Sequence, residues 1–524
     1  MQARQFPLLN AATSRRSFLR QSTCLATAAL ASSCATGPFR RSPKFAAYPF
    51  SLGVASGDPA SDGFVLWTRL APKPLEGGGM PPEPVEVSWI VSEDEKMSRV
   101  VRKGREIAHP EWAHSVHVEL GGLKPDRWYW YQFKCGSELS PVGRTRTSPA
   151  PGSVSDRFRF AFTSCQHFET GYFDAYRHIV RDGVDLIVHL GDYIYEGAGR
   201  EKQVRRHVGG EIFTIDDYRN RHAQYKTDAA LQLAHAAAPW VVTWDDHEVD
   251  NNYAGEIPED FDVPPRRFLV RRAAAYQAYY EHMPLRRYSL PRGPDMQIYR
   301  RISFGNLAEF FVLDTRQYRS DQPCGDRRSP PCPDSLSPKA TLLGPAQRQW
   351  LFDSLDASPA QWKILAQQVM MARVDRSEGE GEEFSMDQWS GYEMERRKVI
   401  GFLQERKIQN PVVLTGDIHS HWANELSTHK DMECRAPVAA EFVGTSISAG
   451  GNGKAVPNYL DQTLAQNPCV KFHNAQRGYV NCEITAKQWR SDYRVMESVT
   501  MPEAPIQTRA SFILEPGTAK LQKA

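Results

Sequence analysis

The sequence predicts a layered α/β domain preceded by a small β-sandwich domain. From about residue 45 to 148, short strand-like runs alternate with Gly, Pro and Asp turns, which is the pattern of a sandwich. After a linker rich in Ser and Pro, strands alternate with helical stretches from 156 to about 500, as they do in α/β domains. A chain of 524 residues is also too long for a single core.

The first domain, residues 45–148, shows its clearest strand-like runs at 63–69, 85–91, 115–120 and 128–133. The segment from Leu123 to Tyr131 resembles the strand corner of fibronectin-type sandwiches, where a tyrosine hydroxyl bonds to upstream backbone. We therefore expect a fibronectin- or Ig-like scaffold. A carbohydrate-binding face is the alternative use of its aromatic residues, and core packing is the favoured one.

The second domain, residues 156–500, combines apolar strands with amphipathic helices. Helical periodicity predicts helices at 172–181, 227–238, 265–283, 344–355 and 394–406. Strands are expected at 158–163, 185–190, 240–244, 308–314, 361–369, 411–415 and 441–447. Residues 501–524 carry no clear pattern and are assigned as a C-terminal tail.

The first 36 residues have the pattern of an export signal. Ser14–Arg20 matches a twin-arginine motif, and a short, weakly apolar stretch follows from Cys24 to Ala35. This stretch is shorter than the roughly 20 apolar residues that span a bilayer. We expect export by the twin-arginine translocase to an extracytoplasmic bacterial location, either the periplasm or the medium. Ala31–Cys34 also resembles a lipoprotein cleavage site, so lipidation at Cys34 is left open.

The charge balance argues against a surface for polyanions. The chain has 64 basic and 62 acidic residues, and removing the four arginines of the signal leaves 60 basic residues. A nearly neutral chain creates no field that attracts nucleic acid. We therefore expect no nucleic-acid-binding domain, and we treat the protein as a monomer.

The cysteines beyond the signal are odd in number: Cys135, Cys165, Cys324, Cys332, Cys434, Cys469 and Cys482. An oxidising compartment favours pairing, so one cysteine is expected to have another role. Cys165 is the natural candidate, because it alone lies at a strand end beside a histidine. The other six allow three disulfides, and Cys324 with Cys332 is the pair that we predict.

Three apolar runs end on polar side chains. The run 185–190 leads into Gly191–Glu196, the run 240–244 into Asp245–Glu248, and the run 411–415 into Gly416–His419. A fourth run, 158–163, ends in Ser164–His167. Open α/β sheets bind their ligands in the crevice at the carboxyl ends of the strands. The sequence therefore predicts a metal site at this edge.

The side-chain types indicate two kinds of metal. Several aspartates in one place repel one another, and bound cations stabilise such a cluster. A phenol with a pKa near 10, Tyr195, calls for a strong Lewis acid such as Fe³⁺, and the Cys165 thiolate suits the same ion. The remaining Asp and Asn oxygens suit Ca²⁺, as one or two ions, with Mn²⁺ or Mg²⁺ as alternatives.

Three motifs identify a family that the chain resembles. Gly191–Tyr195 fits the Gly-Asp-x-x-Tyr motif of purple-acid-type metallophosphoesterases, Asp246–Glu248 stands where many carry Asn-His-Glu, and Gly416–His419 stands where they carry Gly-His-x-His. With Cys165, Leu313–Arg319, the leader and the front β-domain, the chain resembles the PhoD-type alkaline phosphatases. The resemblance implies a calcineurin-like α/β/β/α sandwich for the catalytic domain.

The resemblance also implies a role for each matched residue. The implied iron site consists of the bridging Asp192 with Cys165, Tyr195 and His419. The implied calcium ligands are Asp246 and Asp417, with Asn252 or Asn251 and a carbonyl of Gln367 or Gln368 as weaker candidates. Asp246 is preferred to Asp245 by motif alignment alone. His247 is expected to protonate the leaving group, and Arg316, with Arg319, to contact phosphate.

The implied function is hydrolysis of phosphate monoesters, and of diesters as well, by attack of a metal-bound hydroxide on phosphorus. The expected substrates are small phosphate esters, with phospholipid or teichoic-acid-like phosphodiesters as further candidates. One alternative is a dedicated phosphodiesterase or phospholipase D. The alternative from another class is a secreted binding or adhesion protein whose metals are structural.

Overall fold

The structure is a computed structural model that describes residues 44–153, 155–428 and 436–524. The predicted twin-arginine segment, Cys34 and Cys434 lie outside the described residues. The described residues, from Lys44 onward, belong to one compact unit. Within the described part, no helix is both long enough and apolar enough to cross a bilayer.

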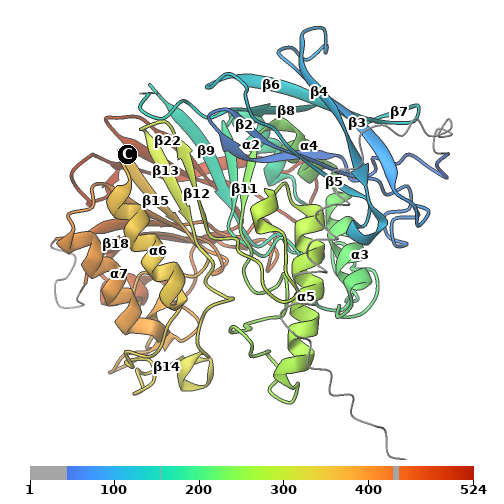
Figure 1. The fold of residues 1–524 in the computed structure, drawn as a ribbon. Coiled ribbons are helices and arrows are strands. Elements are labelled where there is room, and N and C mark those ends of the chain that lie inside the picture. The colour runs from blue at the N-terminus through green and yellow to red at the C-terminus, as the bar shows by residue number, and fades with distance from the viewer. Residues whose placement is uncertain (1–43, 154, 429–435) are drawn as a thin grey trace, which may run out of the picture. The chain divides into compact units, whose positions relative to one another are not determined.

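The largest sheet has ten strands, several of which are labelled in Figure 1. In spatial order they are β25 (Gln522–Lys523), β24 (Ile506–Leu514), β23 (Trp489–Met496), β22 (Gly478–Ile484), β9 (Phe158–Thr163), β10 (Leu186–His189), β11 (Trp240–Val242), β1 (Val54–Ala60), β2 (Gly63–Arg69) and β5 (Ser115–Glu119). The central strands β9, β10 and β11 run parallel. All four residues of β10 are buried, as expected for a parallel strand that is covered on both faces.

A second sheet has eight strands. Their order is β12 (Arg300–Phe304), β13 (Ala308–Val312), β15 (Trp362–Ala366), β17 (Pro411–Thr415), β19 (Ala439–Val443), β18 (His421–Leu426), β21 (Val470–Gln476) and β20 (Gly453–Lys454). The middle strands β13, β15, β17 and β19 are parallel. The small strands β14 (Arg328–Ser329) and β16 (Phe384–Ser385) pair separately.

One hydrophobic core lies between the two large sheets and contains side chains of both. Phe160 of β9 contacts Phe310 of β13 edge to face, with the ring centroids 5.3 Å apart. Burying a side chain of this size stabilises the fold by about 1.5–3 kcal/mol. This core holds the carboxyl ends of the strands of both sheets near one another.

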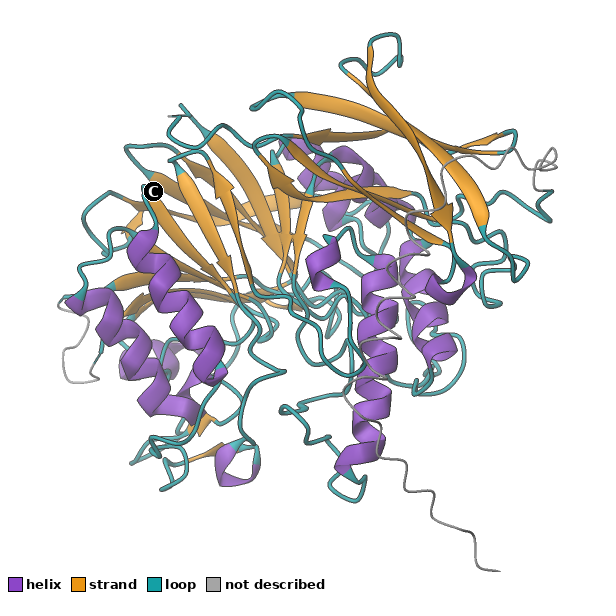
Figure 2. Cartoon of the chain, in the orientation of Figure 1, coloured by secondary structure: helices purple, strands orange, loops and turns teal. Residues whose placement is uncertain are grey.

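Helices cover the outer faces of the sheets (Figure 2). Side chains of α2 (Ala175–Asp182), α4 (Ala229–Ala237) and α5 (Pro265–His282) share a core with the ten-stranded sheet. Those of α6 (Gly344–Ala357) and α7 (Glu393–Glu405) share another core with the eight-stranded sheet. These five helices confirm the predicted helices to within a few residues. Helices α3 (Ile215–Lys226) and α8 (Leu460–Gln466) were not predicted.

The N-terminal strands contribute to two sheets. A five-stranded sheet contains β4 (Val100–Ala108), β3 (Val85–Ser92), β6 (Trp128–Cys135), β7 (Glu138–Leu139) and β8 (Gly143–Arg146). It shares a core with β1, β2 and β5, which extend the ten-stranded sheet through the parallel pairing of β1 with β11. The Tyr129 hydroxyl bonds to the backbone of Lys124 at 3.1 and 3.3 Å, which confirms the predicted strand corner. The predicted domain limits stay a prediction.

The interpretation of 501–524 as a tail without pattern is wrong. Strands β24 and β25 form in this segment and close one edge of the ten-stranded sheet. The alternation of Ala510, Phe512 and Leu514 places these three side chains in buried positions, as expected for a half-buried strand. Proline and the short length of the segment obscured this signal.

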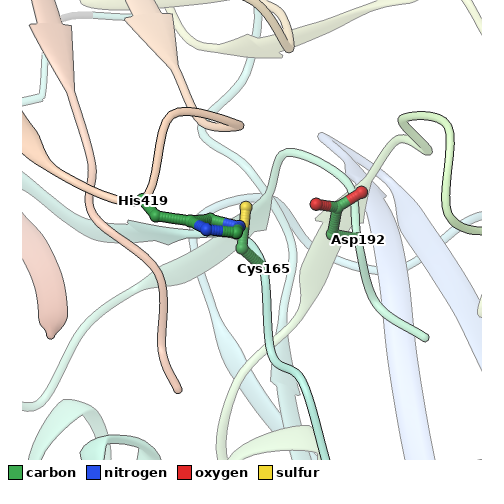
Figure 3. A group of neighbouring side chains, drawn as sticks. All are labelled: Cys165, Asp192 and His419. Atoms are coloured by element: carbon green, nitrogen blue, oxygen red, sulfur yellow. The ribbon is translucent and has the colours of Figure 1, made fainter. Parts of the chain in front are cut away.

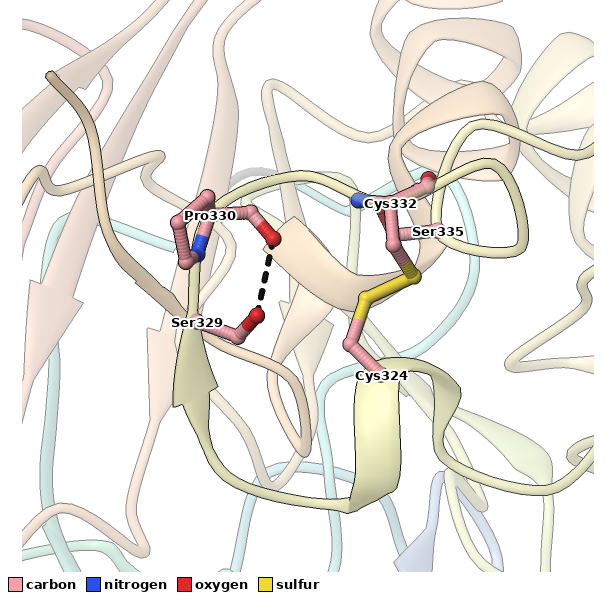
Figure 4. The surroundings of a disulfide bond; sticks show 5 residues. All are labelled: Cys324, Ser329, Pro330, Cys332 and Ser335. Atoms are coloured by element: carbon pink, nitrogen blue, oxygen red, sulfur yellow. Dashed lines mark hydrogen bonds between the residues drawn. A yellow bond between two sulfur atoms is a disulfide. The ribbon is translucent and has the colours of Figure 1, made fainter.

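The state of the cysteines differs from the one predicted from their odd number. Cys324 and Cys332 form the predicted disulfide, beside a turn in which the Ser329 hydroxyl donates to the Pro330 carbonyl at 2.9 Å (Figure 4). Cys165 is a buried free thiol, as predicted, but Cys135 and Cys482 are also free and buried. Both of these lie on strands with the side chain in a hydrophobic core, where a small apolar side chain packs well without pairing. The expectation of three disulfides is therefore wrong.

Candidate metal centre

The polar strand ends meet where the two large sheets face each other. Residues Ser164 and Ser446, at the ends of β9 and β19, form a parallel bridge between the sheets. The segments after β9, β10 and β17 bring Cys165, Asp192 and His419 around one space (Figure 3). In this group, one potential ligand atom of each residue lies within 4.8 Å of the others. The convergence predicted from three separate runs is therefore present.

The backbone at these strand ends is strained. Cys165, Asp192, Asn252, Asp417 and His419 all have φ between 49° and 60°, the left-handed region that costs a non-glycine residue about 1–2 kcal/mol. In this conformation the chain turns sharply as each strand ends. Such outliers gather at functional sites, where the surrounding structure holds them in place. Most of the predicted ligands share this feature.

Tyr195 links the members of this first group. Its hydroxyl donates to Asp192 Oδ2 at 3.0 Å and lies 3.2 Å from His419 Nε2. Cys165 Sγ lies 3.2 Å from Ser164 Oγ and 3.7 Å from the Asp417 carbonyl oxygen. The four residues predicted for the iron site therefore lie together.

A second group contains Asp192, Asp246 and His247, again with one ligand atom of each within 4.8 Å. Asp192 belongs to both groups, as expected for a bridging carboxylate. The His247 ring lies over the Tyr195 ring, 4.1 Å between centroids, and its Nδ1 lies 2.7 Å from Glu196 Oε2. Glu196 was not predicted, and it orients the histidine by accepting from Nδ1.

The carboxylates of Asp245 and Asp246 have different partners in the structure. Asp246 belongs to the second group and accepts the backbone N–H of Asn252 at 2.7 Å. Asp245 Oδ1 instead accepts from Arg316 Nε at 2.5 Å, while its Oδ2 is buried without a partner. Geometry therefore favours Asp246 within the group, and Asp245 becomes an additional candidate ligand through Oδ2.

Arg316 does not occupy the predicted position. Its side chain is fully buried, and its two terminal nitrogens donate to the carboxylate of Asp387 at 2.7 and 2.8 Å. Arg319 is buried as well and bonds to the same carboxylate. The predicted phosphate contact is not supported, because both guanidinium groups are already engaged in ion pairs. Arg316 instead holds the Asp245 carboxylate in place through their ion pair.

The remaining predicted ligands lie at the edge of the cluster. The Asp417 carboxyl is outside both groups, and its pKa is raised well above the usual range by burial first and then by the charge of Asp245. The Asn252 side-chain amide donates to Asp326 at 2.8 Å. The backbone carbonyl of Gln368 accepts from the Gly416 N–H at 2.9 Å.

Glu248 is a structural residue of the site that sequence reasoning did not single out. Its buried carboxylate accepts backbone N–H groups from Asp192 at 3.1 Å, Tyr193 at 2.5 Å and Asp245 at 2.9 Å. It thereby ties the end of β10 to the end of β11. Its position as the last residue of the Asp-His-Glu motif was the available signal.

The donor set fits a cation. Asp192 Oδ1 and Asp245 Oδ2 are buried oxygens without a hydrogen-bond partner among the described residues. Burial, followed by the charge of Asp192, raises the pKa of Cys165 and of Tyr195 well above their usual ranges. Leaving the two buried carboxylate oxygens of Asp192 and Asp245 without a partner is costly, and a bound cation satisfies them. The described residues can therefore hold a metal ion.

Comparisons with known proteins agree on one family. The model of the PhoD-like phosphatase family matches residues 160–493, and the model of its N-terminal domain matches residues 33–149. Alkaline phosphatase D of Bacillus subtilis (strain 168) is 54% identical over 486 residues, which are 92% of this chain and 83% of that protein. A solved structure described as the structure of PhoD superposes with a TM-score of 0.90 at 54% identity, covering 92% of this chain and 93% of that one. The chain belongs to the PhoD-like phosphatase family.

Proposed function

We propose that the protein is a metal-dependent alkaline phosphatase that hydrolyses phosphate monoesters, and diesters as well. The observation that carries this proposal is the position of Asp192 in two adjacent ligand groups. Two metal ions that share one carboxylate can hold a phosphate ester between them. The family relationship supports the same activity.

The donor types suggest which ions bind. Cys165, Tyr195 and His419, with Asp192, suit Fe³⁺, because a phenol and a thiol need a strong Lewis acid to lose their protons. Asp246, Asp417 and Asn252 supply hard oxygens that suit one or two Ca²⁺, with Mn²⁺ or Mg²⁺ as alternatives. Asp245 Oδ2, buried without a partner, is a further ligand candidate on this side. When bound, these cations supply Lewis-acid activation of water and neutralise the phosphoryl charge.

His247 is proposed as the acid that protonates the leaving oxygen. Glu196 accepts from its Nδ1 at 2.7 Å, which leaves Nε2 as the nitrogen available to the ester. Burial lowers the pKa of His247, but the charges of Glu196 and then Asp246 outweigh burial and raise it well above the usual value. The His247 ring also packs against the Tyr195 ring, with 4.1 Å between the centroids and a tilt of 34°, which restrains its orientation.

Several further features are proposed together. The parts of the two large sheets that lie within 156–500, with their covering helices, form a calcineurin-like α/β/β/α catalytic domain, and the β-sandwich domain is proposed at 45–148. Strands β1, β2 and β5 of the front segment and β24 and β25 of the C-terminal segment extend the ten-stranded sheet beyond these limits. The first 36 residues direct export through the twin-arginine translocase to the periplasm or the medium, where a monomer acts on small phosphate esters. Phospholipid or teichoic-acid-like diesters are further candidate substrates.

The test is substitution of Asp192 by Asn, which keeps the size of the side chain and removes its charge. We expect turnover of 4-nitrophenyl phosphate to fall at least a thousandfold, with no loss of folded protein by circular dichroism. Activity near that of the wild type would overturn the proposal. Deleting the β-sandwich would be a poorer test, because β1, β2 and β5 belong to the ten-stranded sheet.

A further inference from the structure

A loop at the rim of the metal centre presents an exposed arginine. The loop follows Glu196 and ends where α3 begins, at Ile215. Within it, the Arg200 side chain is 63% exposed. A charge at the edge of a reaction site can select among substrates, so its surroundings bear on which esters the enzyme prefers.

Glu169 holds this part of the loop in place. Its fully buried carboxylate accepts the backbone N–H of Arg200 at 2.7 Å and that of His207 at 3.1 Å. Arg200 Nε also lies 3.4 Å from Glu169 Oε2. Because two of these bonds use backbone N–H groups, they persist when the Arg200 side chain is replaced.

His167 connects Arg200 to the metal centre. The residue is only 7% exposed, and its ring lies 4.3 Å, centroid to centroid, from the ring of Tyr195. His167 Nε2 lies 3.3 Å from a terminal nitrogen of Arg200. The guanidinium is therefore about one ring width away from a predicted metal ligand.

The His167 ring and the Arg200 guanidinium direct hydrogens toward each other, and these hydrogens repel unless an acceptor lies between them. His167 Nδ1 accepts the backbone N–H of Glu169 at 3.2 Å, so the ring carries its hydrogen on Nε2. A guanidinium has donors only. Nε2–H and Arg200 are thus two donors that face the same place, and an anionic oxygen is the group that both can bind.

We propose that Arg200 and His167 form an anion subsite for a second negative group of the substrate, beside the phosphoryl group that reacts. This inference rests on the proposed phosphatase activity and narrows its substrate class to esters that carry a carboxylate or a further phosphate near the scissile bond. Arg200 is the exposed half of the subsite, and His167 is the buried half.

The test compares two aryl monoesters, 4-nitrophenyl phosphate and 4-carboxyphenyl phosphate, which differ in the charge of the leaving group. For Arg200→Ala we expect kcat/KM to fall about 5–10-fold more for the carboxylated ester than for the nitrophenyl ester, mainly through KM. Arg200→Lys should recover part of this difference. His167→Phe, which keeps a ring against Tyr195, should change the ratio in the same direction.

Arg206→Ala is the matched control, because Arg206 lies on the same loop with the same 63% exposure and pairs with the exposed Glu201. It should leave the ratio of the two esters unchanged. An Arg200→Ala enzyme that loses activity equally on both esters, or on neither, overturns the subsite. A wild-type enzyme that hydrolyses neither ester refutes the phosphatase proposal instead, so the two failures are distinguishable.

Discussion

The buried ion pairs of Arg316, next to the candidate metal centre, lead to the most demanding prediction, which concerns the replacement of Arg316 by Met. Methionine keeps an unbranched, uncharged side chain but is shorter than arginine, so the change removes the guanidinium and the volume that it fills. In the native fold this group bonds to Asp245 and to both oxygens of Asp387, and Asp246 Oδ1 lies 3.6 Å away. Arg319 still pairs with Asp387 in the variant, but Asp245 is left without its partner.

Breaking a buried pair by removing one partner costs about 3–5 kcal/mol, because a buried charge stays uncompensated. The unfolding entropy grows with chain length, so in a unit of this size each kcal/mol shifts Tm by about 1 °C. We therefore expect Arg316→Met to lower Tm by about 3–5 °C. We also expect the purified variant to retain less metal, since Asp245 and Asp246 lose their support.

The assay is differential scanning calorimetry, combined with metal analysis of the same samples. The control is Arg406→Met, since Arg406 pairs with Asp356 at the surface, where both side chains are about half exposed, and exposed pairs contribute little. We expect no measurable change in Tm for the control. If Arg316→Met keeps the wild-type Tm and metal content but raises KM for phosphate esters, Arg316 contacts substrate and its assignment as a buried support is wrong.

Three further predictions follow from other parts of the fold. Gly191→Ala should destabilise the protein and impair metal binding, because a Cβ there would lie 2.5 Å from Asp245 Cβ. Gly183→Ala is the control, because Gly183 also has a positive φ, 67° against 113° for Gly191, but has open space around it; it should cost only backbone strain, and equal Tm values would refute the clash. Burial lowers the pKa of Lys226 from its usual 10.5 to about 7. The buried ammonium therefore destabilises the folded state fully below pH 7, and this destabilisation disappears as the pH rises toward 10.5. Lys226→Met should raise Tm more at pH 7 than at pH 10, and an equal gain at both would contradict this. Replacing Cys324 and Cys332 by Ser should cost about 2–3 kcal/mol from the short loop that they close, and an unchanged Tm in oxidising buffer would show that the disulfide is dispensable.

The convergence of most candidate ligands could be predicted because each candidate follows its strand directly. Asp192 and Tyr195 are three residues apart in one motif, and a parallel strand points whatever follows it into the crevice. The same reasoning placed Cys165 and His419 at this edge, whereas the choice of Asp246 over Asp245 came from motif alignment alone. Local sequence was sufficient to bring the candidate ligands together wherever a candidate directly follows its strand.

The supporting contacts could not be predicted, because they join residues that are distant in sequence. Asp387 lies 71 residues from Arg316, and no local pattern shows that the two form a buried pair. The fully buried Arg316 is engaged by that contact, which argues against the phosphate contact that was predicted for it.

The fold shows the same contrast between local features, which could be predicted, and contacts between distant segments, which could not. Helices α5 and α6, which each have a proline in the first turn, were predicted almost to the residue. The pairing of β1 with β11 at Gly57 and Trp240 joins segments far apart in sequence, and it turns part of the front sandwich into an extension of the large sheet. Strand periodicity predicts strands but not their neighbours.

The most direct test of the metal centre is elemental analysis of the full-length protein purified without chelator, by inductively coupled plasma mass spectrometry. The donor set of Cys165, Asp192, Tyr195 and His419 predicts about one iron per chain, with calcium bound alongside it through the hard oxygens. A protein that carries two zinc ions and no iron would contradict the assignment of the ions. A protein with full phosphatase activity and no bound metal would contradict the metal centre itself.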